Sequence, residues 1–119
     1  MTDKTTLLSP LNDQSLSEEE RQFVNDLLHS YGQMVKQNEQ MFSDTCQHQG
    51  VPEHICIRAM IQILQHRAGT LAAHLLADSG ADDIIVEAQI TELSTRMKDV
   101  VRKQMTLSRK TVDRIGPRP

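Results

Sequence analysis

The residues best suited to chemistry in this sequence are two cysteines and two histidines near its middle. They form the pattern Cys46-x-His48, five residues, then His54-x-Cys56. Two thiolates and two imidazoles are a ligand set that zinc accepts. However, the spacing matches none of the standard zinc signatures, and residues two apart on a helix point in different directions. We therefore expect no bound metal, and the four residues remain the candidate ligands of a metal-responsive regulator.

The same cysteines bear on the compartment in which the protein works. Two cysteines are too few for a disulfide-stabilised secreted domain, and no signal-peptide pattern opens the sequence. We expect a reducing cytoplasm, which disfavours a disulfide between Cys46 and Cys56. The most apolar stretch, residues 71–77, is far shorter than a membrane span, so we expect no membrane partner.

Positive charge gathers at the end of the sequence. Eight basic and two acidic side chains give residues 96–119 a charge of +6, so the rest carries −9 within a net charge of −3. On a helix most of these cations would lie opposite the apolar face, where they could engage an acidic protein or the phosphates of a nucleic acid. The candidate partner-binding residues are Lys98, Arg102, Lys103, Arg109, Lys110 and Arg114.

Patterns that indicate catalysis are absent from the sequence. There is no nucleophile elbow, no glycine-rich phosphate loop and no dinucleotide fingerprint, and the Glu-x-x-His pairs of a di-iron bundle are missing. We therefore expect a protein that is not an enzyme, with no catalytic residues and no cofactor.

Three long amphipathic helices account for most of the chain. Ser17 followed by Glu20 is a capping box that predicts the first helix, and apolar residues then repeat at intervals of three and four up to Phe42. Residues 52–78 form the second predicted helix, which Gly80 should end. Asp82 or Asp83 should cap the third, which ends before residues 116–119.

Short connections between long helices favour antiparallel neighbours. The predicted fold is all-α, an up-down-up antiparallel bundle over residues 17–116, preceded by a flexible arm over 1–16 and followed by a tail over 117–119. Within it the second helix is apolar on most sides, which predicts that neighbours surround it. The residues expected to be most buried are Ile61, Leu64, Leu71 and Leu75.

The predicted core is poor in large side chains, which bears on function. The chain has six Met, two Phe, one Tyr and no Trp, so self-association would add buried surface that one copy lacks. Our first hypothesis is a non-enzymatic module of coiled-coil-like helix–helix contacts, a homo-oligomer or a binder of an acidic protein. A nucleic-acid-binding accessory protein is the alternative, although it would lack stacking aromatics and any known DNA-binding motif. The expected oligomer interface contains Met105, Val112 and Ile115.

Overall fold

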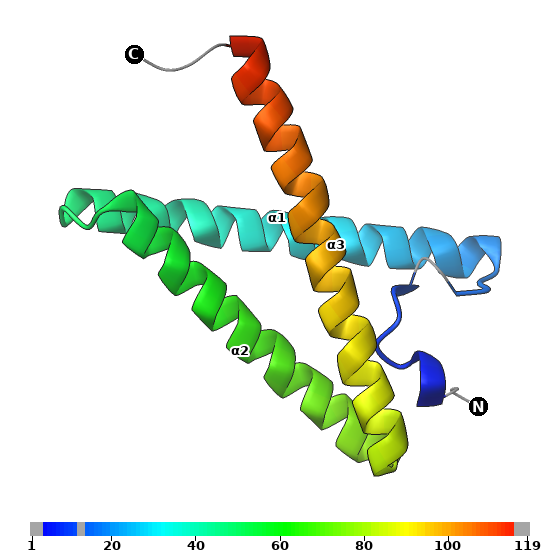
Figure 1. The fold of residues 1–119 in the computed structure, drawn as a ribbon. Coiled ribbons are helices and arrows are strands. Elements are labelled where there is room, and N and C mark those ends of the chain that lie inside the picture. Colours follow the sequence, from blue (N-terminus) through cyan, green and yellow to red (C-terminus); the bar gives the residue numbers. More distant parts are fainter. Residues whose placement is uncertain (1–3, 12–13, 116–119) are drawn as a thin grey trace. The chain divides into compact units, whose positions relative to one another are not determined.

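The protein is helical throughout the part that the structure describes. The computed structural model describes the backbone of residues 4–11 and 14–115, and the side chains of these residues as far as 110. A short 3-10 helix, η1 (Lys4–Thr6), precedes α1 (Glu18–His48), α2 (Glu53–Ser79) and α3 (Asp83–Ile115) (Figure 1). This confirms the all-α class and the three long helices. In the described ranges, no helix offers an apolar stretch that could cross a bilayer.

Local hydrogen bonds define where α1 and α3 begin. The Ser17 hydroxyl accepts the Glu20 backbone N–H at 3.1 Å, while a carboxylate oxygen of Glu20 accepts the Ser17 N–H at 3.2 Å. These two bonds are the predicted capping box. At α3, the carboxylate of Asp82 accepts the N–H of Ile85 at 2.9 Å, so Asp82 caps this helix.

Glycine follows the ends of α1 and α2, and for Gly80 the sequence predicts this. Gly50 has φ +74° and Gly80 has φ +69°, a left-handed conformation that glycine adopts without steric cost. After α1, the N–H of Val51 donates to the Cys46 carbonyl at 2.8 Å and the N–H of Gly50 donates to the Gln47 carbonyl at 3.1 Å. This pair of bonds is a Schellman motif, which satisfies carbonyls that the helix end leaves open.

The chain divides into two compact units. One contains residues 10–78, and the other contains residues 1–9 together with 79–119. In the first unit α1 and α2 both extend from their connecting turn to the same side, with opposite chain directions, and diverge with distance from it (Figure 1). These two helices therefore form an open hairpin, and the place of α3 in the up-down-up order stays a prediction.

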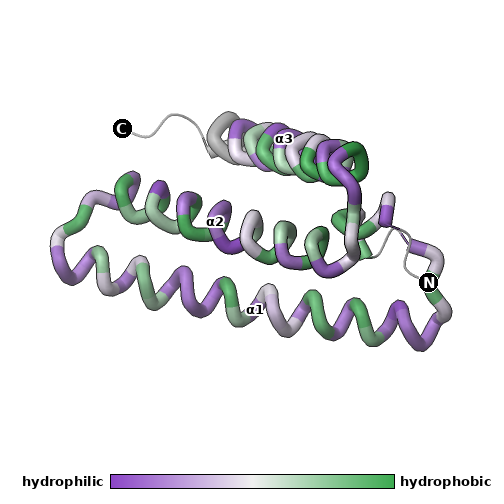
Figure 2. Tube along the Cα trace, turned by 90° about the horizontal axis from the view of Figure 1, so that it is seen from below, coloured by the Kyte–Doolittle hydropathy of each residue, from purple (hydrophilic) through white to green (hydrophobic). Residues whose placement is uncertain are grey.

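Few side chains are buried. Among the described residues the buried apolar side chains are Cys46, Cys56 and Leu76, while hydrophobic positions recur along all three helices (Figure 2). The prediction of a buried centre on α2 is wrong, because its four residues are 43% to 56% exposed. The physical reason is that α2 is apolar around most of its circumference, whereas α1, its partner in the same unit, diverges from it (Figure 1) and leaves that surface largely uncovered. The four residues are Ile61, Leu64, Leu71 and Leu75.

Residues 4–9 lie against α3 in the second unit. The Leu8 N–H donates to the Gln89 side chain at 2.8 Å, and the Ser9 hydroxyl donates to Glu92 at 2.7 Å. The sequence assigns this segment to a flexible arm over residues 1–16, because its polar composition and isolated leucines show no partner. The contacts instead come from polar side chains of a helix more than 80 residues away. Residues 1–3 and 12–13 of the predicted arm lie outside the described residues.

Candidate interaction surfaces

Basic side chains and a methionine share one side of α3. Lys98, Arg102, Met105 and Arg109 are spaced by four, three and four residues, which places them in one row along the helix. All four are exposed, with Met105 at 45%, and none of the three cations forms an ion pair in the described part of the chain. We call this row the α3 basic patch.

The α3 basic patch borders an apolar depression on the same helix. A shallow hollow of about 380 Å³ is lined by Met105 and Arg109 together with two valines, Val100 and Val101, and two polar residues. The predicted interface residue Met105 thus lies next to the predicted partner-binding residue Arg109. The expectation that the cations lie opposite the apolar face is wrong for this row, because Arg109 borders the apolar hollow. Lys103 and Lys110 are also exposed, about 100° further around the helix. Arg114, Val112 and Ile115 lie beyond the residues whose side chains are described.

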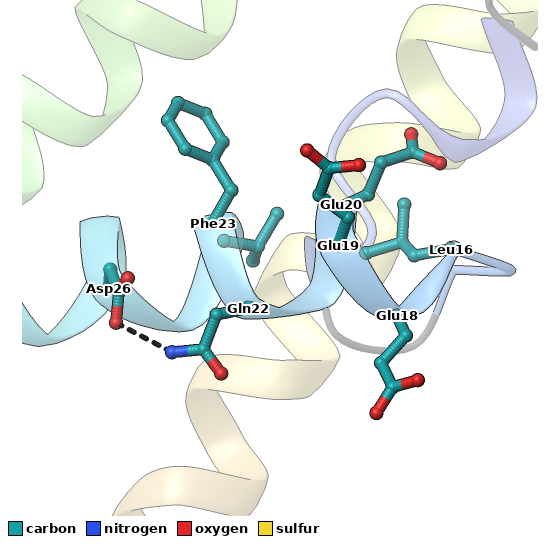
Figure 3. Close-up of a pocket in the computed structure, with 8 residues that line it drawn as sticks. Leu16, Glu18, Glu19, Glu20, Gln22, Phe23 and Asp26 are labelled. Carbon is teal, nitrogen blue, oxygen red and sulfur yellow. Dashed lines mark hydrogen bonds between the residues drawn. The ribbon is translucent and has the colours of Figure 1, made fainter.

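An acidic surface with an exposed phenylalanine occupies the start of α1. Figure 3 shows Phe23 projecting from the helix on the same side as the carboxylates of Glu19 and Glu20, with Glu18 on the other side. Phe23 is 64% exposed, and it lines a hollow of about 740 Å³ with Leu16, Val24 and four acidic residues. We call Glu19, Phe23 and Asp26, which are spaced by four and three residues, the α1 acidic patch.

Local bonds hold two of these carboxylates. Asp26 accepts a hydrogen bond from the Gln22 side-chain amide at 3.1 Å (Figure 3). The side chain of Ser17, and then its backbone, lower the pKa of Glu20 by hydrogen bonding, because a hydrogen bond to the charged form favours that form. The start of α1 therefore carries a fixed negative charge at neutral pH, beside exposed apolar side chains.

The hairpin has an apolar hollow of its own. It measures about 310 Å³ and lies between α1 and α2, near the turn that joins them. Its lining is mainly apolar or aromatic, and several of the lining side chains are exposed. Hollows of this kind are places where a further helix can pack. The lining residues are Tyr31, Val35, Asn38, Glu39, Phe42, Ala59, Met60, Ile63 and Leu64.

The cysteines of the candidate metal site meet at the turn, but the histidines do not join them. Cys46 and Cys56 are 7% and 3% exposed, and both line one hollow at the turn. Burial, followed by the contact with Cys46, raises the pKa of the Cys56 thiol. His48 and His54 are exposed, and no group of three or more metal-ligating side chains occurs among the described residues. The turn therefore presents a dithiol.

The chain matches no protein-family model, and no curated protein and no solved structure shows significant similarity to it.

The sequence pattern does not predict one polar cluster on α3. Gln89, Glu92 and Arg96 contact residues 4–9, and Gln89 is 2% exposed. The available signal was the position of Gln89, three residues after Val86 and four before Leu93, at the edge of the apolar stripe. A polar residue at such a position is buried only when it has a hydrogen-bonding partner.

Proposed function

We propose that this protein is a non-enzymatic helical assembly module that forms a homo-oligomer through contacts between α1 of one copy and α3 of another. The observation that carries the proposal is the pair of complementary patches. Each has an exposed apolar side chain flanked by charges of one sign, negative on α1 and positive on α3.

The spacing of the two patches matches when the helices run antiparallel. On α3, Arg102, Met105 and Arg109 are separated by three and four residues. Read backwards, the α1 acidic patch of Asp26, Phe23 and Glu19 has the same separations. At 1.5 Å rise per residue, an antiparallel pairing would place Met105 on Phe23 and each arginine beside a carboxylate.

The apolar contact would supply most of the affinity, and the charges would orient it. Exposed ion pairs contribute about 0–1 kcal/mol each, whereas apolar burial contributes about 25 cal/mol per Å². A sulfur atom against an aromatic ring adds a further favourable contact. Because each copy carries both patches, a two-fold arrangement would form the contact twice.

Light scattering on single substitutions tests the proposal. The wild-type chain should be a dimer or larger at tens of micromolar, and Met105→Glu should weaken association at least tenfold, because it brings an acid against the α1 acidic patch. Leu107→Glu is the matched control, since Leu107 is similarly exposed at 49% but lies about 160° around α3 from Met105. It should associate as the wild type does. A monomeric wild-type chain would refute the proposal.

A charge exchange tests the pairing of α1 with α3. Arg109→Glu should weaken association mainly at low salt, since salt screens exposed charges. Adding Glu19→Arg to Arg109→Glu should restore it. If association were indifferent to both changes while Arg109→Glu abolished salt-sensitive binding to DNA or RNA, the nucleic-acid alternative would replace this proposal. That alternative is favoured by one observation, the unpaired cations of the α3 basic patch.

A further inference from the structure

Gln89 holds residues 4–9 by both ends of its side-chain amide. Its oxygen accepts the backbone N–H of Leu8 at 2.8 Å, and its nitrogen donates to the backbone carbonyl of Thr5. Among the described residues, Gln89 is the one buried polar residue, with 2% of its surface exposed. Since both partners are backbone groups three residues apart, Gln89 recognises the shape of a single peptide turn.

Two further side chains on the same face of α3 complete the contact. Glu92 accepts the Ser9 hydroxyl at 2.7 Å, and the guanidinium of Arg96 donates to the Leu8 carbonyl. Gln89, Glu92 and Arg96 are spaced by three and four residues, so they lie in one row along the helix. We call these three residues the α3 clamp.

The α3 clamp retains one unused donor. The Nε of Arg96 is buried and has no hydrogen-bond partner among the described residues. A buried donor of this kind is costly unless a partner satisfies it, and such groups in native proteins call for an explanation. Residues 4–9, although bound to α3, leave this donor without a partner.

We propose that the α3 clamp is a binding site for a short peptide turn, that residues 4–9 are its ligand, and that a second copy of the chain can supply the same segment. The ligand chemistry is a backbone carbonyl, a backbone N–H three residues later, and then a hydroxyl. Main-chain hydrogen bonds supply affinity in this kind of recognition, and the side chain supplies selectivity.

The position of the ligand in the chain favours exchange between copies. Residues 1–9 belong to the same unit as α3, although the 69 residues from 10 to 78 form a unit of their own between them. Replacing one copy's segment with that of another preserves every hydrogen bond, which is the basis of segment swapping. The exchange rests on the proposed self-association, whereas the α3 clamp itself does not.

The test uses a full-length chain whose own segment is disabled. Leu8→Pro removes the N–H that donates to Gln89, since proline has none. A fluorescent peptide of residues 1–11 should bind this chain, as measured by anisotropy, and should bind the wild type at least tenfold more weakly, because the tethered segment competes at high effective concentration. Absence of binding to the Leu8→Pro chain would overturn the proposal.

Two second-site variants separate the clamp from the rest of α3. Adding Gln89→Ala to Leu8→Pro should reduce peptide affinity at least tenfold, whereas adding Gln104→Ala, at an exposed glutamine of the same helix, should leave it unchanged. Alanine favours helix, so circular dichroism should stay the same. Equal affinities for the two variants would contradict the assignment.

Amide hydrogen exchange tests the site without a peptide. In the wild-type chain the Leu8 N–H should be protected, and Gln89→Ala should return it to the rate of an unstructured peptide. Gln104→Ala should not. These measurements do not require association between copies. A monomeric wild type would therefore refute the proposed oligomer and the exchange between copies, but it would not contradict the α3 clamp. Unprotected Leu8 in the wild type would refute the clamp.

Discussion

Oxidation of Cys46 and Cys56 should lock the hairpin at its turn. The two thiols are buried, and both line a hollow of about 420 Å³ that gives a small oxidant access. With hydrogen peroxide, one thiol forms a sulfenic acid and releases water, and the second thiol displaces a second water to form the disulfide. Because the chain has two cysteines, Cys46–Cys56 is the one disulfide that can form within a single copy.

The size of the stabilisation follows from the loop that the bond closes. Cross-linking a loop of about ten residues removes chain entropy worth about 2.7 kcal/mol at 25 °C. For a chain of this length, 1 kcal/mol corresponds to a shift of several degrees in Tm, so oxidation should raise Tm by about 10 °C. The reaction should be slow at neutral pH and accelerate in alkali, because burial raises the pKa of the Cys56 thiol and the thiolate is the reactive form.

Mass spectrometry and thermal melting together measure the effect. The oxidised chain should lose about 2 Da, migrate as a monomer on a non-reducing gel and melt at the higher temperature until dithiothreitol reverses it. Cys56→Ser is the control, since it keeps a hydroxyl at this position but has no second thiol and should show no shift. Dominant intermolecular disulfides, or an oxidised monomer with an unchanged Tm, would refute the described packing of the two thiols.

Two further predictions concern the helix ends. Gly50→Ala should destabilise the protein by about 1–2 kcal/mol in urea unfolding, because φ is +74° at Gly50 and L-residues with a Cβ disfavour that region. Gly69→Ala, within α2 and with open space around it, is the control and should instead stabilise the protein by about 0.5–1 kcal/mol. Equal changes in unfolding free energy for the two substitutions would contradict the Schellman turn. Ser17→Ala should raise the pKa of Glu20 towards its ordinary 4.5, measured by NMR titration. Because the pKa of Glu20 is lowered in the folded state, this group stabilises the fold above pH 4.5, and the contribution is lost as the pH falls through the folded pKa. An unchanged Glu20 pKa in Ser17→Ala would contradict the capping box.

Helix ends could be predicted because their signals are local. The capping box of Ser17 and Glu20, the cap at Asp82 and the stops at Gly50 and Gly80 each depend on groups within one or two helical turns. Their hydrogen bonds therefore form wherever the helix forms. The thiols of Cys46 and Cys56 meet for a related reason, since a Schellman turn reverses the chain between them.

Burial could not be predicted from periodicity, because it depends on which other segments lie alongside. Leu71 belongs to the most apolar stretch of the sequence, yet it is more than half exposed, whereas the polar Gln89 is buried. The apolar pattern shows which face needs cover but not whether a neighbour supplies it. For Gln89 the partner is a backbone turn at residues 5–8, and backbone groups leave no trace in the side-chain pattern.

The long sequence separation between residues 4–9 and the α3 clamp has a consequence during protein synthesis. The hydrogen bonds join residues 81 to 88 positions apart, so at about 5–20 residues per second the ribosome makes the segment roughly 4–18 s before its own clamp. A helical hairpin forms in far less time, and the segment waits alone while α1 and α2 assemble. During that interval the segment has no clamp of its own, so the clamp that it can meet is one on a completed copy of the chain.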